Sequence, residues 1–226
     1  MRTVHPPAAD HPAADDGEAW PPGKLQIRDA ALALFAEHGP DAVSMRDIAA
    51  AADVSLGLLV HHFGTKERLR RAVDDHVAGV FDGMIASLVD DPTALVDAAE
   101  GMPGGIAEVM LRHLPPNSPM PAYLRRLMLS GDGAGHVLFR RWFDLTVTAM
   151  GTFESAGVVR ASDDPAARAA FLLVNDLAVL LLRWHLAAVL DGDPLAPEGV
   201  RRWSAAVADV YLHGVLPADD GPTTKE

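Results

Sequence analysis

The stretch from Ser44 to Phe63 restricts the fold of this chain more than any other, because it predicts two short helices joined by a tight turn. Ser44 is a good N-cap residue, and Asp47 three positions later completes a capping-box pattern for the first helix. Asp53 falls in the turn, where aspartate tolerates a left-handed backbone better than most residues other than glycine. Ser55 can then cap the second helix.

The apolar residues of this stretch predict how the two helices pack. Ile48, Ala49 and Ala52 form one face of the first helix, and Leu59 and Phe63 face inward from the second at i and i+4 spacing. A helix, a turn of three to four residues and a second helix make a helix-turn-helix. In that motif the first helix braces the second, which offers its amino-terminal half to the major groove of DNA.

The rest of the chain also has a helical pattern. No segment shows the sustained alternation of apolar and polar residues that a half-buried strand requires, and Pro- and Gly-rich joints separate the apolar segments. The expected fold class is therefore all-α. Further helices are expected over Lys24–His38, Thr65–Leu88, Thr93–Leu114 with an interruption near residues 102–105, Met120–Leu129, His136–Ser155, Pro165–Leu190 and Glu198–Leu216.

The run from Ser44 to Leu69 resembles the DNA-binding signature of the TetR (tetracycline repressor) family. The upstream helix that ends in Leu34-Phe35-Ala36-Glu37-His38-Gly39 is also similar to the family's first helix, whereas beyond this region only helical character and length agree. The positions that match the signature are Ser44, Ile48-Ala49, Ala52, Val54-Ser55, Gly57, Leu59, His62-Phe63, Lys66 and Leu69.

This resemblance implies a one-component transcriptional regulator, most often a repressor. Such a protein binds a pseudo-palindromic operator in double-stranded DNA as a homodimer and releases it when a small-molecule effector binds. It implies an N-terminal three-helix DNA-binding domain and a C-terminal helical ligand-binding and dimerisation domain. The expected boundaries are a disordered tail over 1–23, the helix-turn-helix domain over 24–71, the ligand-binding and dimerisation domain over 72–216, and a disordered tail over 217–226.

The second helix of the motif departs from the family pattern in offering few polar side chains. Val60 stands where the family usually has Tyr, and Leu56 and Leu58 lack hydrogen-bonding groups, although all three can contact thymine methyl groups. Arg46, Ser55 and His61 must then carry much of the hydrogen bonding, while Lys66 matches the family's phosphate-gripping lysine. The expected DNA contacts are Lys24, Ser44, Arg46, Ser55, Leu56, Gly57, Leu58, Val60, His61, His62 and Lys66.

The charge distribution is consistent with local DNA binding. The formal net charge of -12 argues against a protein that binds nucleic acid over its whole surface. Residues 24–71, however, hold seven Lys and Arg against six Asp and Glu, a net of +1, so the remainder carries -13. The basic charge is thus segregated into the segment that contains the motif.

The sequence favours a cytoplasmic protein without a membrane segment. Phe171 to Leu190 is apolar enough to be compared with a membrane span, but it contains Asp176 and Arg183, which cost about 2.5–3.5 kcal/mol each at mid-bilayer. A helix buried by protein explains it better. The first residues lack the basic start and apolar stretch of a signal peptide, and the chain has no cysteine.

The last two long helices are expected to form a dimer seam. In Pro165–Leu190 the polar residues Arg168, Asn175, Asp176 and Arg183 gather on one arc, and the rest is more apolar than a single-sided core helix needs. Leu181 is expected at the seam. The last helix adds Val200, Trp203, Val207, Val210 and Tyr211, so that two helices per subunit can form a four-helix interface around a two-fold axis.

A pocket for an apolar or aromatic ligand is expected among the middle helices. A stripe of aromatic residues and Met is more often core than pocket, so only some of the candidates are expected to touch the ligand. The candidates are Met110, His113, Tyr123, Leu127, Met128, Phe139, Trp142, Phe143, Thr146, Met150, Phe153, Asn175 and Trp184.

Two other classes of function stay open on the sequence, an uncharacterised all-helical enzyme and a helical adaptor that binds only protein. The chain shows no nucleophile–base spacing, no HExxH and no phosphate loop. No cofactor or metal is expected: His61 and His62 are adjacent on a helix and point about 100° apart. The run Ser130–Gly135 precedes a helix, but no strand precedes it and no Lys follows, so a loop is expected there.

Overall fold

The computed structural model describes residues 21–90, 106–115, 117–131 and 133–213, and all the regular structure in this part of the chain is α-helix, as the sequence predicts. Both predicted tails, apart from residues 21–23, and the predicted interruption near residue 102 lie outside these residues. The helices are α1 Pro22–His38, α2 Met45–Ala51, α3 Leu56–Phe63, α4 Lys66–Asp90, α6 Ile106–His113, α7 Met120–Leu129, α8 Gly133–Ser155, α9 Pro165–Leu181, α10 Arg183–Leu190 and α11 Pro197–His213.

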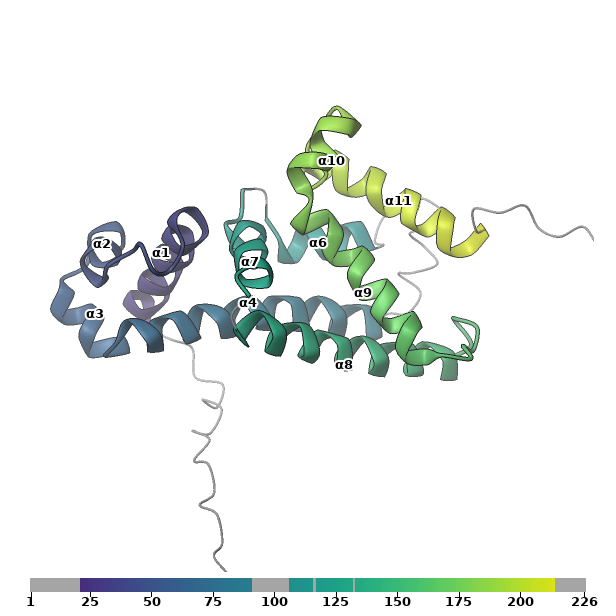
Figure 1. Ribbon diagram of the computed structural model, residues 1–226, viewed down its shortest axis with the longest axis horizontal. Helices are drawn as coiled ribbons and strands as arrows, with labels where there is room; N and C mark the ends of the chain where they lie inside the picture. The colour runs from purple at the N-terminus through teal and green to yellow at the C-terminus, as the bar shows by residue number, and fades with distance from the viewer. Residues whose placement is uncertain (1–20, 91–105, 116, 132, 214–226) are drawn as a thin grey trace, which may run out of the picture.

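The long helix α4 connects the two parts of the molecule (Figure 1). Its first turns lie beside α1–α3 at one end, and its later turns run alongside α8 and against α6. One hydrophobic core runs through both parts, from Phe35 of α1 through Val73 of α4 to Tyr123 of α7 and Trp142 of α8. Helix α4 is continuous across the predicted boundary at residues 71 and 72, so a rigid element joins the motif to the rest of the protein.

The prediction of one helix over Pro165–Leu190 is wrong. The helix breaks at Leu182, and α9 and α10 meet at a bend of 76°. No Gly or Pro lies between Pro165 and Leu190 to mark the break, but the bend lets Arg183 form an ion pair with Asp193, which follows α10. Among the described helices none is by itself long and apolar enough to cross a membrane, and only the bent pair α9–α10 together has the necessary length and composition.

The joint between α7 and α8 is shorter than predicted, because α8 begins at Gly133 and not at His136. Gly135 therefore lies in the first turn of α8, where the helix meets the backbone of α7. A Cβ atom added to Gly135 would lie 2.3 Å from the carbonyl oxygen of Leu127. Only glycine allows the two helices to approach this closely.

Gly135→Ala is therefore expected to destabilise the fold. The added methyl group must push α7 and α8 apart, at a cost of about 1–3 kcal/mol. Gly151→Ala on the same helix is the matched control, because a Cβ there meets nothing within 4 Å, and it is expected to stabilise the protein by about 0.5–1 kcal/mol. Urea unfolding followed by circular dichroism measures both changes. Equal midpoints for the two variants would contradict the close approach.

Candidate nucleic-acid interface and effector region

The two short helices of the motif are both capped by serine. The hydroxyl of Ser44 accepts a hydrogen bond from the Asp47 backbone N–H at 3.2 Å, and the Asp47 carboxylate accepts from the Ser44 backbone N–H at 2.8 Å. The Ser44 hydroxyl also donates to the Asp47 carboxylate at 2.7 Å. This hydrogen bond and, to a smaller extent, that from the Ser44 backbone N–H lower the pKa of Asp47, so the capping box holds with Asp47 ionised. In α3, the Ser55 hydroxyl accepts from the Leu58 backbone N–H at 3.1 Å. Both predicted caps are confirmed.

The turn between α2 and α3 has the predicted left-handed residue. Asp53 has a φ angle of 49°, a conformation in which aspartate is tolerated better than most side chains. Ile48 and Ala49 of α2 and Leu59 and Phe63 of α3 are buried, as their spacing predicts. Because the inner faces are packed in this way, the orientation of α3 is set by the core, and its outer face is left free for a partner.

The outer face of α3 is apolar in its first two turns. Leu56, Leu58 and Val60 are exposed to 38%, 39% and 46% of their surface, so three large apolar side chains are exposed within five residues of one helix. Gly57 and His61 are exposed beside them, and His62 is half-buried. His61 and His62 have ring centroids 5.4 Å apart at 60° to each other. These side chains give α3 a surface that suits the floor of a DNA groove.

Basic side chains occur on the helices next to α3. Arg46 is exposed in the first turn of α2, and Lys66, half-buried, is the first residue of α4, which Gly64 and Thr65 separate from α3. Lys24 lies in the first turns of α1, whose start packs near α3: a Cβ on Gly23 would lie 3.8 Å from Nε2 of His62. The residues predicted to contact DNA thus lie on α1–α4 and at the N-caps of α2 and α3.

The residues predicted to line a pocket are dispersed between core and surface. Tyr123, Leu127, Trp142 and Phe153 are buried, and Trp184 is exposed. The Tyr123 hydroxyl donates to Asp74 at 2.5 Å. The others are half-buried: Met110, His113, Met128, Phe139, Phe143, Thr146, Met150 and Asn175.

Trp142 has a polar atom that the protein leaves unused. Its ring packs against Phe81 of α4 with centroids 4.7 Å apart, but its indole N–H is buried without a hydrogen-bond partner within the described residues. An unsatisfied buried donor costs about 1–3 kcal/mol. Trp142 therefore presents an unused donor at the contact between α4 and α8.

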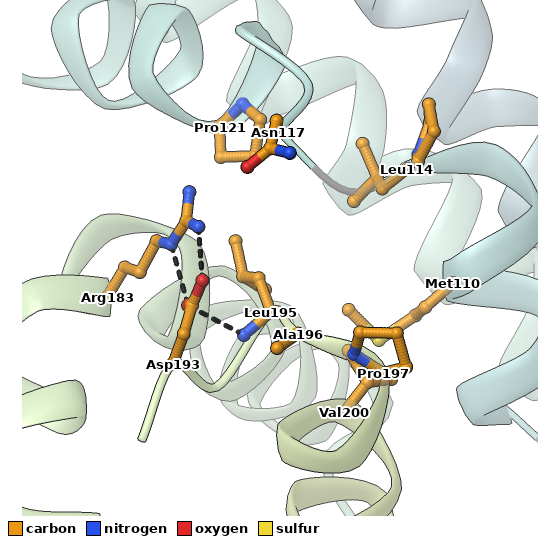
Figure 2. Close-up of a pocket in the computed structure, with 11 residues that line it drawn as sticks. Met110, Leu114, Asn117, Pro121, Arg183, Asp193, Leu195, Ala196, Pro197 and Val200 are labelled. Carbon is orange, nitrogen blue, oxygen red and sulfur yellow. Dashed lines mark hydrogen bonds and ion pairs between the residues drawn. The ribbon is translucent and has the colours of Figure 1, made fainter. Parts of the chain in front are cut away.

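A small cavity lies between α6, the start of α7, and the α10–α11 connection (Figure 2). Its volume is about 90 Å³, too small for most organic ligands, whose sites have about 300–1,000 Å³. Arg183 and Asp193 face each other at its edge, with Nε of Arg183 2.8 Å from Oδ1 of Asp193. The hydrogen bond raises the pKa of Arg183 and lowers that of Asp193. Of the predicted pocket residues only Met110 lines it.

Helices α9–α11 expose a further apolar surface. Phe171 and Val174 of α9 and Trp184 and Val189 of α10 are more than half exposed, and Tyr211 of α11 accepts a hydrogen bond from Asn175 at 3.0 Å. Exposed apolar side chains that gather on neighbouring helices often mark interfaces in soluble proteins. Phe171, Val174, Trp184, Val189 and Tyr211, called here the α9–α11 face, correspond to the predicted seam.

A doubly capped helix-turn-helix, exposed on its reading side and followed by a helical domain, defines a DNA-binding regulator of transcription. The chain belongs to the TetR family. Residues 27–73 match the family model described as bacterial regulatory proteins of the tetR family, and residues 117–217 match the tetracyclin repressor-like C-terminal domain.

Relatives and solved structures agree with this membership. The HTH-type transcriptional regulatory protein RaaS of Mycobacterium tuberculosis is 36% identical over 152 residues, 66% of each chain. The HTH-type transcriptional repressor Rv3405c of the same organism is 39% identical over 90 residues, 38% of this chain and 47% of that protein. The fatty acid degradation regulator FadR of Bacillus halodurans has the same fold, with a TM-score of 0.66 at 17% identity over 88% of this chain and 98% of that one.

Proposed function

We propose that this protein is a one-component repressor that binds a pseudo-palindromic operator as a homodimer and releases it when a small apolar or aromatic molecule binds. The exposed face of α3, with Arg46, Lys66 and Lys24 on the neighbouring helices α2, α4 and α1, is the observation that carries the proposal. A cytoplasmic location follows, since the operator is chromosomal. Repression is favoured because a relative, Rv3405c, is named a repressor. Family membership leaves the adaptor and enzyme alternatives without a supporting observation.

The proposed contacts follow from the side chains available. Helix α3 enters the major groove with its amino-terminal half, where Leu56, Leu58 and Val60 pack against thymine methyl groups. Arg46 reaches a base edge from α2, and the Ser55 hydroxyl can donate to DNA while its oxygen caps α3. Lys66 contacts a phosphate at the start of α4.

The α9–α11 face supports a two-fold dimer. The family's two-fold operators require two reading helices at a spacing of about 34–36 Å, which one protomer cannot supply. Docking the α9–α11 face on its own copy buries Phe171, Val174 and Trp184, which are otherwise left in water. Dimerisation and operator symmetry are thus explained by the same surface.

Gel retardation on DNA taken from beside the protein's own gene tests the proposal directly. The repressor is expected to shift an operator fragment at nanomolar concentration and a scrambled fragment of equal length only at concentrations at least a thousandfold higher. An enzyme or a protein-binding adaptor would shift neither fragment.

Lys66 and Arg46 are expected to serve DNA binding in different ways. Lys66→Ala should weaken operator and random DNA alike and reduce the salt slope by about one counterion per protomer. Arg46→Ala should cost about 1–3 kcal/mol on operator and less on random DNA. Fluorescence anisotropy at several salt concentrations separates the two cases. If both variants lost affinity equally on operator and random DNA, Arg46 would not contact a base.

A further inference from the structure

The contact between α1 and α7 joins the DNA-binding domain to the helical domain through one arginine. Nε of Arg126 donates to the carbonyl oxygen of Ala36 at 2.8 Å, and Nη2 donates to that of Glu37 at 2.5 Å. Both carbonyls belong to the last turn of α1, where no intrahelical donor remains. Arg126 of α7 therefore provides hydrogen-bond donors to the last turn of α1, and its positive charge interacts favourably with the negative end of the helix dipole.

A groove of about 580 Å³ lies beside this contact. Its volume falls in the range of about 300–1,000 Å³ typical of small-molecule sites, unlike that of the cavity at Arg183 and Asp193. It is lined by residues of both domains: His38, Gly39, Pro40, Asp41, Ala42, Arg70, Tyr123, Arg125, Arg126, Leu127, Leu129 and Ser130.

The charge of the groove is opposite to that of the chain. Three arginines line it, and the lining includes one carboxylate, that of Asp41, although the protein as a whole carries -12. Two of the arginines are engaged: Arg126 caps α1, and Arg70 lies beside the Tyr123 hydroxyl. Arg125 is half-buried and has no hydrogen-bond or ion-pair partner within the described ranges. Its five N–H donors are left for a ligand.

The groove also has an apolar side. Leu129 is 71% exposed. Pro40, Leu127 and the ring of Tyr123 also line the groove and add apolar surface to it. A guanidinium binds carboxylate and phosphate groups through paired N–H donors, and a short apolar chain would cover Leu129. We propose that this groove is a binding site for a small organic anion, with a carboxylate or phosphate group on Arg125 and an apolar portion on Leu129.

Calorimetry on the full chain without DNA tests this site independently of the proposed operator binding. The probes are inorganic phosphate, octanoate and octyl phosphate. One molecule of octyl phosphate is expected to bind per protomer, more tightly than inorganic phosphate does, and the comparison with octanoate tells which head group is preferred. Arg125→Ala should weaken octyl phosphate binding at least tenfold, and Arg125→Lys should weaken it less because the charge remains.

A control variant separates the groove from other basic surfaces. Arg160→Ala removes an equal charge from the connection between α8 and α9, which is distant from α1 (Figure 1). Arg160→Ala should leave octyl phosphate affinity within about twofold, because screened charges act only over about 10 Å. The proposal is overturned if the wild type shows no saturable binding up to millimolar probe, if Arg125→Ala binds like the wild type, or if Arg160→Ala weakens binding as much as Arg125→Ala.

Discussion

Phe171→Glu is expected to convert the proposed dimer into a monomer and to lower operator affinity by about 10²–10⁴-fold. The Phe171 side chain is 66% exposed in the protomer, so a charge there leaves the protomer fold intact. In a dimer that joins the α9–α11 faces, the same carboxylate would be buried without a partner, which costs several kcal/mol. The affinity falls because two linked reading helices bind with a high effective concentration that single protomers lack.

Sedimentation velocity gives the oligomeric state, and anisotropy with labelled operator gives the affinity. Val137→Glu is the matched control: Val137 is 68% exposed on α8, outside the α9–α11 face, and this variant should remain a dimer that binds DNA. Leu181, which the sequence suggests for the seam, packs against the core. A charge at Leu181 would therefore disturb the protomer fold and could not test the dimer contact alone. A Phe171→Glu protein that sediments as a dimer would place the seam on another surface.

The sequence predicts the helix-turn-helix well because its determinants are local. The caps at Ser44 and Ser55 and the left-handed Asp53 act within three or four residues, and the core positions follow from helical spacing. The bend at Leu182 has no such signal: no Gly or Pro occurs between Pro165 and Leu190, and the ion pair of Arg183 depends on Asp193 beyond α10. Periodicity detects helices but not where tertiary contacts break them.

The groove beside the α1–α7 contact and the cavity at Arg183 and Asp193 have no signal in the sequence either. Arg126 reaches carbonyl groups 89 and 90 residues away, a pairing that no local pattern encodes. Helical spacing does not tell whether an aromatic side chain lines a pocket or fills a core. Tyr123 and Trp142 are both buried, and their spacing in the sequence is compatible with either role. The indole N–H of Trp142, which has no hydrogen-bond partner among the described residues, distinguishes Trp142 from an ordinary core residue, and only the structure shows it.

Operator DNA is expected to weaken the binding of an apolar aromatic ligand by about 5–150-fold. The physical route starts at Trp142, whose free N–H can donate to a ligand acceptor and whose ring packs against Phe81 of α4. The rings of Trp142 and Phe81 pack with centroids 4.7 Å apart, so a ligand that enters between them must displace α4 or α8. Helix α4 begins at Lys66, at the proposed phosphate contact, so its displacement alters the spacing of the two reading helices.

Nile red, a neutral aromatic dye with a carbonyl acceptor that fluoresces in apolar surroundings, serves as the probe. Its affinity is measured by fluorescence titration with the protein alone, with saturating operator, and with the same concentration of scrambled DNA. Linkage requires that the operator weaken dye binding by the factor with which the dye weakens operator binding. Scrambled DNA should leave dye binding unchanged, and Trp142→Phe should weaken it because the ring remains while the donor is lost. Equal dye affinities with and without operator would mean that the region around Trp142 is not coupled to the reading helices.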